Sequence, residues 1–547
     1  MNLTPLCRWL AVFLFTLPTV APAAEWQWSV PVPPMAGQTE QPRAYLWIPP
    51  NCQRVRGVIF GHNNMEEEGV LEHPTFRKAA ADLGFAEVWV APGFDRNFRF
   101  DLGAGERFDA MLQALATQSG YTELTTAPLV PVGHSAAAST PWYIAAWKPE
   151  RVLAGISFSG QWPYVPDVKE APQVAGRSVD TVPGLVTAGE YEWADESMSR
   201  GLKTKADHPQ MPLSGLGCPA DGHFAATDEK VEFLALYLRK AAQYRLPQIT
   251  PKVGPVTLNA IDPTKTGWLV DRYQINTDPS APAAPVGEYK GDPAQAFWYF
   301  DGEIAQAAEA FQKKHRGQAA LVGYVQNGEV VPQRPGTHPQ VWLKFLPEAD
   351  GVTFHLTGAF IDTVPGGRPT RWTGKKEGEI IEKPAGNPPV EIRRITGPVR
   401  QISADTWILD LNRSSLLGDR RGNDAWFVAT WPGDAKFKRP VQQSTLQIPV
   451  RNADGQPQKI DFHLPAQIHR TASAIQLTAT ADSGLPVYYF VREGPATIDG
   501  NTLKLTALPP RAKFPVTITV IAWQWGRSLD PKVQTAEPVE QAISLVP

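Results

Sequence analysis

A serine within the segment Gly133-His134-Ser135-Ala136-Ala137 has the surroundings that nucleophilic chemistry needs. A serine hydroxyl is a weak nucleophile at neutral pH, so it needs a histidine that takes its proton and a backbone turn that exposes it. The residues before this segment are apolar and predict a buried strand, and the residues after it suit a helix. We interpret the segment as a tight strand-to-helix turn that presents Ser135, with Gly133 and Ala137 small enough to relieve its crowding. The alternative is a serine that caps a helix.

A histidine and three carboxylates that could serve Ser135 lie later in the chain. The histidine is His223, which follows an Asp-Gly pair and precedes a predicted helix. The carboxylates are Glu190, Glu192 and Asp195, in one short loop after a predicted strand. A histidine works as a general base when a carboxylate orients its ring, so one of the three acids is enough. The alternatives are an ordinary loop histidine and a solvated acidic loop.

Negative charge that develops on a reacting carbonyl oxygen needs hydrogen-bond donors. The turn Gly61-His62-Asn63-Asn64 follows an apolar strand and is placed to supply one. We expect the backbone N–H of Asn63, or that of Asn64, to form an oxyanion hole together with the N–H of Ala136. His62 either takes part in the chemistry or is a structural residue that supports the turn around Ser135.

The segments that position these residues alternate between short apolar strands and helices. This alternation predicts an α/β fold, with a mostly parallel sheet and helices on both of its faces. Such sheets bind ligands at the carboxyl ends of their strands, where all of the residues above fall. The predicted strands span residues 44–48, 57–60, 86–91, 129–132, 153–158 and 184–188, and the predicted helices span residues 74–82, 106–118, 135–147 and 230–243.

The chain has 547 residues, which is enough for about three domains. We predict a catalytic domain at residues 25–247. A proline-punctuated, β-rich region at 255–460 predicts a sandwich-like accessory domain with a helix at about 301–315. The aromatic run at 297–300 is expected to pack that helix onto its sheet, and the alternative is that it lines the substrate cleft. A further β-rich domain is predicted at 466–547.

The first residues predict that the protein is exported. Arg8 precedes an apolar run at residues 9–15, and Ala21-Pro22-Ala23 offers a small-residue cleavage site, so residues 1–23 are predicted to be a signal peptide. No later segment approaches the roughly 20 apolar residues that a membrane-spanning helix needs. We therefore expect a periplasmic or secreted protein without a membrane span.

The composition argues against several kinds of partner. The chain has 52 basic and 55 acidic residues, a formal charge of -3, and no basic run that could follow a phosphate backbone, so nucleic acid is not an expected partner. The histidines lack metal-ligand spacing and no glycine-rich phosphate loop is present, so we expect neither a metal nor a cofactor. Cys52 and Cys218 are predicted at opposite ends of the sheet, which argues against a disulfide without excluding one. The oligomeric state stays open.

The order of these elements resembles that of the α/β-hydrolase superfamily over roughly residues 40–245. The resemblance implies that Ser135 is the nucleophile and His223 the general base, with an acid between them in the chain. In similar enzymes the acid often stands three residues beyond the glycine that ends its strand. This spacing points to Glu192 and leaves the other two acids of its loop as alternatives.

The same resemblance extends to the turn after the first parallel strand and to the later domains. The superfamily commonly carries His-Gly where this chain has Gly61-His62, but a backbone donor depends little on the side chains beside it. The exported, multi-domain layout is similar to that of bacterial carbohydrate esterases. The stretches 477–487, 494–503 and 516–520 resemble a bacterial immunoglobulin-like module.

The resemblance implies an exported serine hydrolase that cleaves carboxylic esters through an acyl-enzyme, with esterified carbohydrate such as plant cell-wall polysaccharide as the expected substrate. One alternative is a serine peptidase, or a lipase or polyester hydrolase, that uses the same triad. Another is an inactive hydrolase-fold protein whose β domains serve binding or adhesion.

Overall fold

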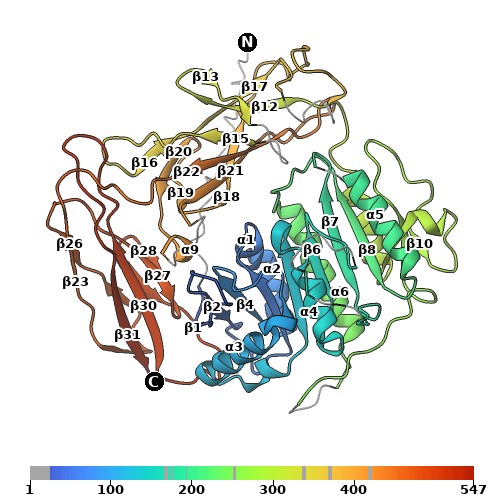
Figure 1. Cartoon of the computed structure of the whole chain (residues 1–547), viewed down its shortest axis with the longest axis horizontal. Coiled ribbons are helices and arrows are strands. Elements are labelled where there is room, and N and C mark those ends of the chain that lie inside the picture. The colour runs from blue at the N-terminus through green and yellow to red at the C-terminus, as the bar shows by residue number, and fades with distance from the viewer. Residues whose placement is uncertain are drawn as a thin grey trace, which may run out of the picture.

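The computed structural model describes residues 25–547 apart from 165–170, 173, 175, 193, 250–253, 335–339, 367–372 and 417–421. The predicted signal peptide at 1–23 lies outside the described residues. An N-terminal α/β unit is followed by a middle and a C-terminal unit that are both rich in strands (Figure 1). Within the part of the chain that the structure describes, no helix combines the length and the apolarity that crossing a membrane requires.

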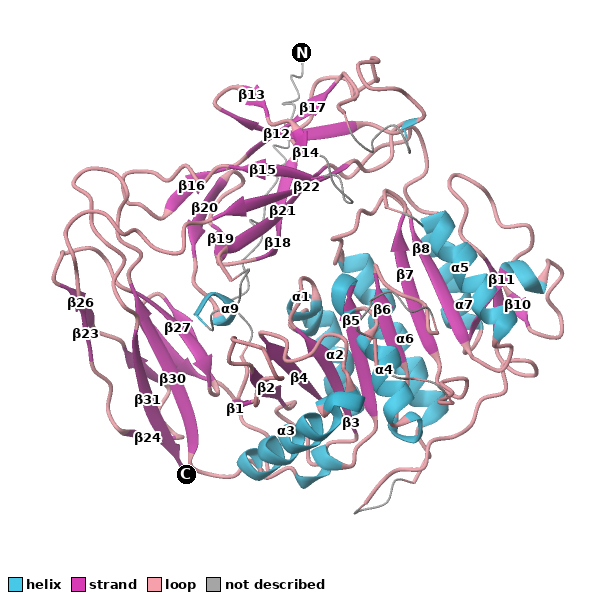
Figure 2. Ribbon diagram, in the orientation of Figure 1, coloured by secondary structure: helices cyan, strands magenta, loops and turns pink. Residues whose placement is uncertain are grey.

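An eight-stranded sheet forms the centre of the N-terminal unit (Figure 2). The strands are β1 (Trp28–Pro31), β2 (Arg43–Trp47), β3 (Gly57–His62), β4 (Phe85–Ala91), β5 (Leu129–His134), β6 (Gly155–Phe158), β7 (Gly184–Gly189) and β8 (Leu213–Cys218). Their order is β1-β2-β4-β3-β5-β6-β7-β8. The β1–β2 and β2–β4 pairs are antiparallel, and all other pairs are parallel. This is the α/β-hydrolase fold, as predicted.

Helices connect the parallel strands and cover the sheet. They are α1 (Glu67–Leu71), α2 (Pro74–Leu83), α3 (Ala104–Ser119), α4 (Thr140–Trp147), α5 (Ala194–Asp207) and α6 (Asp228–Arg245). Helix α2 packs against α6 on one face, and Gly105 of α3 lies against Trp147 of α4 on the other. The sequence also sets helix ends: the Thr227 hydroxyl caps α6, and Gly84 ends α2 with a φ of 68°.

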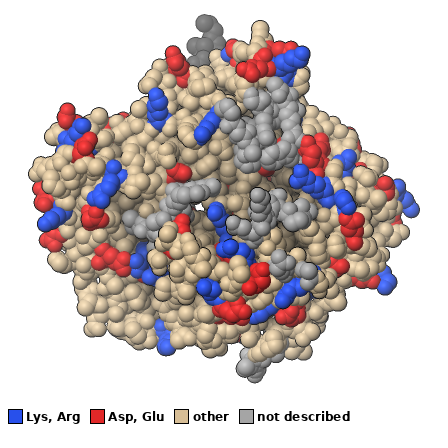
Figure 3. All heavy atoms as spheres, in the orientation of Figure 1, with Lys and Arg blue, Asp and Glu red and all other residues tan. Residues whose placement is uncertain are grey.

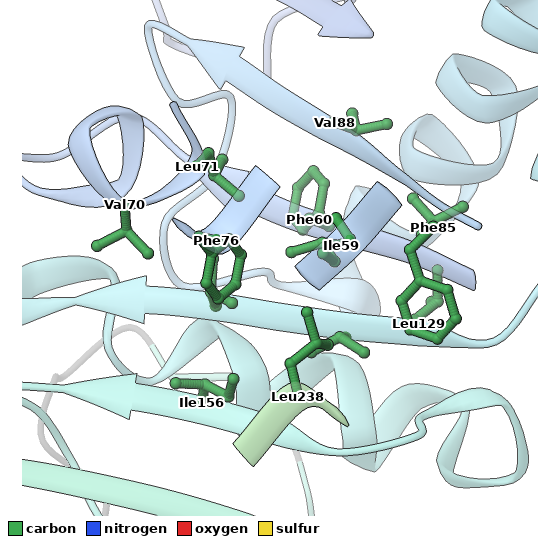
Figure 4. Close-up of a cluster of buried hydrophobic side chains, with 14 of the residues drawn as sticks. Ile59, Phe60, Val70, Leu71, Phe76, Phe85, Val88, Leu129, Ile156 and Leu238 are labelled. Atoms are coloured by element: carbon green, nitrogen blue, oxygen red, sulfur yellow. The ribbon is translucent and has the colours of Figure 1, made fainter. Parts of the chain in front are cut away.

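The core of this unit lies where strand and helix side chains meet (Figure 4). Ile59, Leu129 and Ile156 come from adjacent strands, and Phe76 of α2 and Leu238 of α6 pack in the same cluster. All five are buried. Burial of each large apolar side chain contributes roughly 1.5–3 kcal/mol, which holds the sheet rigid beneath the loops at its carboxyl edge.

The N-terminal unit continues past the predicted boundary at residue 247. The strands β9 (Trp268–Asp271), β10 (Ala284–Pro285) and β11 (Ala296–Tyr299) form a small sheet, which α7 (Gly302–Gln312) follows. Phe297 of β11 stacks on Trp162 with ring centroids 5.3 Å apart, and it fills the space that Gly215 of β8 leaves. The aromatic run at 297–300 is therefore buried, as predicted, but in the core of the N-terminal unit. The accessory domain begins after α7 rather than at 255, because these short strands pack onto β8.

The middle unit, residues 320–448, is rich in strands, and its core around Trp407 and Phe427 also includes Trp523 and Trp525 of the C-terminal unit. Its elements are β12 (Leu321–Gln326), β13 (Glu329–Val330), β14 (Gln333–Arg334), β15 (Gln340–Leu343), β16 (Thr353–His355), β17 (Thr357–Ile361), β18 (Glu391–Thr396), β19 (Val399–Gln401), β20 (Thr406–Leu409), α9 (Arg413–Leu416), β21 (Asp424–Thr430) and β22 (Val441–Gln447). The largest sheet has the order β14-β15-β22-β21-β18, and two three-stranded sheets accompany it.

The C-terminal unit, residues 460–547, packs against the edge of the hydrolase sheet. Its strands are β23 (Ile460–Phe462), β24 (Gln467–His469), β25 (Ala474–Gln476), β26 (Ala479–Ala481), β27 (Tyr488–Glu493), β28 (Ala496–Asp499), β29 (Thr502–Leu505), β30 (Val516–Trp523) and β31 (Val539–Val546). The Gly494 N–H donates to the Trp26 carbonyl at 2.8 Å, and the Lys513 N–H donates to the Ser119 carbonyl at 3.0 Å. Trp26 lies just before β1, and the Ser29 hydroxyl of β1 donates to the Glu493 carboxylate at 2.9 Å, so the C-terminal unit covers the β1 edge, which would otherwise be open to pairing with another chain.

The surface carries charges of both signs, and the two cysteines of the described chain are not bonded to each other. Acidic and basic side chains are interspersed on the face shown in Figure 3, in keeping with the nearly balanced charge of the chain. Cys52 and Cys218 are both buried and free, so the structure holds no disulfide between them.

Candidate active site

Ser135 lies on a strained turn directly after β5. Its φ is 52°, a left-handed conformation that residues other than glycine seldom adopt. A short 3₁₀ turn spans Ser135–Ala137 and α4 begins only at Thr140, so the single helix predicted at 135–147 is broken here. Gly133 makes the turn possible, because a Cβ at that position would overlap the carbonyl oxygen of Ala137. The local geometry is that of a nucleophile elbow.

His223 and Glu192 reach Ser135 from two neighbouring loops at the carboxyl edge of the sheet. His223, after β8, has its Nε2 2.7 Å from the Ser135 Oγ. Its Nδ1 is 2.5 Å from the Oε1 of Glu192, which follows β7. Both side chains are largely buried, which strengthens the electrostatic contact between them. The arrangement can transfer the Ser135 proton to the imidazole while the carboxylate orients the ring.

The other two acids of the loop occupy different environments. The Glu190 carboxylate is buried and forms an ion pair with Lys438 of the middle unit. It also accepts hydrogen bonds from the Ala220 N–H at 3.0 Å and from the Tyr273 hydroxyl at 2.8 Å. Asp195 lies in the first turn of α5, where a negative charge suits the exposed N–H groups. Of the three, Glu192 is the acid that meets the His223 ring.

The structure corrects the predicted oxyanion donor after β3. The Asn63 N–H donates to the Val90 carbonyl at 2.7 Å, and the Asn64 N–H is 3.2 Å from the Oε2 of Glu67. Both donors are therefore engaged within the protein. The prediction failed because β3 runs beyond its apolar residues, so the ladder with β4 extends over Asn63. Ala136 is exposed, and among the described residues its N–H has no acceptor.

Glu67 supports the site in a way that the sequence analysis overlooked. Its Oε2 accepts hydrogen bonds from the Asn64 N–H and, at 2.9 Å, the Met65 N–H, while its Oε1 accepts one from the His134 N–H at 2.8 Å. The side chain is fully buried, and burial raises the pKa of Glu67 to about 7. One carboxylate thus ties the turn after β3 to the residue before Ser135. The available signal was the run of three glutamates at 66–68, which is unusual beside apolar segments.

His134 is a second residue whose role the sequence analysis did not identify. Its ring is buried and packs against the ring of His223, with centroids 4.9 Å apart. Its Nε2 lies 3.0 Å from the backbone carbonyl oxygen of His223, so a protonated Nε2 donates a hydrogen bond there. His134 thus connects the turn that carries Ser135 to the loop after β8 that carries His223.

His62 occupies a structural position rather than a catalytic one. Its ring is fully buried, with centroid distances of 5.0 Å to Phe60 and 4.8 Å to Phe94. Burial, with a smaller contribution from the positive charge of Arg96, lowers the pKa of His62 to about 3. The imidazole is therefore neutral at physiological pH and acts as part of the packing beneath the turn.

Replacement of His62 by phenylalanine should stabilise the protein more in acid than at neutral pH. The pKa of His62 is about 3 in the folded state, below the roughly 6.5 of an unfolded histidine. Between these values the unfolded chain binds the extra proton, so the wild type loses stability as the pH falls through about 6.5. The gain in unfolding free energy from His62→Phe should therefore grow by about 1.4 kcal/mol per pH unit below that point. Urea unfolding near pH 7 and near pH 5 measures it, and an equal difference at both would contradict a buried neutral imidazole.

Comparisons with known proteins find similarity at the level of solved structures. No family model matches the sequence, and no curated protein matches it. Est1E from Butyrivibrio proteoclasticus is 15% identical, with 39% of this chain and 96% of that chain covered and a TM-score of 0.26. An S-formylglutathione hydrolase from Agrobacterium tumefaciens is 15% identical, with 39% and 94% covered and a TM-score of 0.29. One from Staphylococcus aureus is 11% identical, with 39% and 97% covered and a TM-score of 0.29. The similarity thus concerns about two fifths of this chain.

Proposed function

We propose that this protein is an exported serine hydrolase that cleaves carboxylic esters through an acyl-enzyme. The observation that carries the proposal is the contact series from Ser135 Oγ to His223 Nε2, at 2.7 Å, and from His223 Nδ1 to Glu192 Oε1, at 2.5 Å. The strained φ of Ser135 adds support, because a position that stores strain in a buried hydrogen-bonded cluster is typical of catalytic centres.

In the proposed mechanism His223 removes the Ser135 proton as the hydroxyl oxygen attacks the ester carbonyl. The oxyanion of the tetrahedral intermediate receives a hydrogen bond from the Ala136 N–H. The intermediate collapses, the imidazolium protonates the departing alcohol, and the acyl group remains on Ser135. Water then attacks the acyl-enzyme with His223 as base again, which releases the acid and restores the hydroxyl. Glu192 orients the ring and stabilises the imidazolium in both halves.

Esterified carbohydrate is the substrate class that we propose, on the basis of the exported, multi-domain layout of the sequence. The aromatic residues near the carboxyl edge contribute little to this choice. Trp142, Trp162 and Tyr191 are buried, so they build the walls of the hydrolase unit rather than offer open faces to a sugar ring.

A fluorophosphonate probe should label the wild type and should fail to label Ser135→Ala. The probe reacts with a serine that an adjacent base activates, so labelling reports the proposed nucleophile directly. Ester hydrolysis by Ser135→Ala should fall by about 10⁴-fold or more. Gel fluorescence and hydrolysis of p-nitrophenyl acetate measure the two effects. Equal labelling of both proteins, or of neither, would overturn the proposal.

Replacement of Glu192 by glutamine should lower kcat by about 10⁴-fold with little change in KM, because an amide cannot stabilise the imidazolium or fix its tautomer. Asp195→Asn is the matched control, since it also replaces a carboxylate by an amide but does so three residues later, in the first turn of α5. Steady-state kinetics on a soluble ester compares the two. A larger loss in Asp195→Asn than in Glu192→Gln would transfer the role of the acid.

A substrate panel should separate carbohydrate esters from lipids, polyesters and peptides. We expect higher kcat/KM on acetylated, methyl-esterified or feruloylated polysaccharide than on p-nitrophenyl esters of long acyl chains. Release of acetate, methanol or ferulate measures the first group, and absorbance of p-nitrophenolate the second. A preference for long chains would contradict the carbohydrate assignment and leave the ester chemistry intact.

A further inference from the structure

The middle unit contacts the loops of His223 and Glu192 through a short segment before and within β22. Lys438 forms a buried ion pair with Glu190, two residues before Glu192. Both side chains are almost fully excluded from solvent, at 2% and 1% exposed. Glu190 also accepts hydrogen bonds from the Ala220 N–H and the Tyr273 hydroxyl. This one carboxylate therefore joins the loop after β7, the loop after β8 and the middle unit.

Arg439 holds both loops at once. Its guanidinium pairs with the carboxylate of Asp221, two residues before His223. Its backbone carbonyl accepts a hydrogen bond from the Tyr191 hydroxyl at 2.7 Å, and Tyr191 is the residue directly before Glu192. Arg439 of the middle unit is therefore bonded to Asp221, close to His223, and to Tyr191, next to Glu192.

Gln443 makes the third contact, at the residue after His223. Its side-chain carbonyl accepts a hydrogen bond from the Phe224 N–H at 2.9 Å. The approach is close, because a Cβ on Gly222 would lie 2.6 Å from that oxygen. The Phe224 ring also packs on Trp426 of β21, with centroids 5.1 Å apart. A side chain at residue 222 would therefore displace the Gln443 amide from its place beside the loop of His223.

We propose that Lys438, Arg439 and Gln443, here termed the clamp, are positioning residues that hold His223 and Glu192 in register with Ser135. Their partners lie 218 to 248 residues away in the chain and flank both catalytic side chains. Stability alone does not account for the clamp, because a buried ion pair is commonly no more stabilising than apolar residues of the same size. The two ion pairs instead fix the positions of the loops that carry Glu192 and His223. The middle unit is therefore a working part of the catalytic site, an inference that rests on the proposed ester hydrolysis.

The first test combines Lys438→Met with Glu190→Gln. The double variant removes both charges, so no uncompensated charge stays buried and the fold is retained. We expect kcat for p-nitrophenyl acetate to fall about 10- to 100-fold, since a misplacement of about 1 Å in a catalytic group can cost about 10²-fold. KM should change little, because the clamp acts on the reacting geometry and not on the bound ester. The rate of fluorophosphonate labelling should fall with kcat.

The second test uses Gln443, whose replacement introduces no change at an ion pair. Gln443→Met keeps the volume and adds no charge but removes the acceptor for the Phe224 N–H. We expect this variant to lose kcat per labelled molecule with little change in KM. A purely structural role would instead lower the melting temperature and the labelled fraction, with kcat per labelled molecule unchanged.

Lys436→Met is the matched control, because Lys436 lies two residues before Lys438 and forms only an exposed ion pair, with Glu382. It should keep wild-type kcat. Wild-type kcat in both clamp variants would overturn the inference and leave the proposed function standing. A wild type that neither hydrolyses esters nor reacts with fluorophosphonate would overturn the proposed function, and the inference with it.

Discussion

The backbone of Ser135 is held at a φ of 52°, and much of the site is organised to keep it there. Such a conformation costs on the order of 1–3 kcal/mol and persists only where the surroundings over-determine it. Gly133 removes the steric clash, Glu67 anchors the N–H of His134, and His134 in turn reaches the carbonyl of His223. Because these contacts are buried, the hydroxyl and the imidazole are aligned before any substrate binds, which is the condition for electrostatic preorganisation.

Buried carboxylates are the main means by which the protein fixes this geometry. Burial raises the pKa of Glu67 to about 7, and its hydrogen bonds from backbone N–H groups act in the opposite direction. An apolar side chain in its place would leave the N–H groups of Asn64, Met65 and His134 without an acceptor, at a cost of about 1–3 kcal/mol each. A carboxylate here is therefore explained by the donors that it satisfies. The same reasoning applies to Glu190, which serves three donors from three segments.

Local sequence patterns predicted the sheet and the turn at Ser135, because strand periodicity and the Gly133 spacing depend on short stretches of chain. The resemblance to the α/β-hydrolase superfamily pointed to Glu192 and His223, and the structure brings both side chains to Ser135. The local patterns failed at Asn63, where the length of β3 decides which N–H groups remain free. They also gave no sign of the contacts that Lys438 and Arg439 make, because a surface lysine and a buried one look alike until a distant segment is known to cover them.

The position of the middle unit changes how the catalytic loops should be understood. Within the hydrolase unit, the loops after β7 and β8 are linked by bonds such as that from the Tyr191 N–H to the Asp221 carbonyl at 2.9 Å. The His134 ring also ties the loop after β8 to the turn that carries Ser135, and the Tyr273 hydroxyl holds the Glu190 carboxylate. The middle unit supplies a cation to each of two buried carboxylates, Lys438 to Glu190 and Arg439 to Asp221. Removal of the Lys438 charge alone would leave the Glu190 charge buried without this partner, at a cost of about 3–5 kcal/mol, so groups that join the two units also fix the loops at the site.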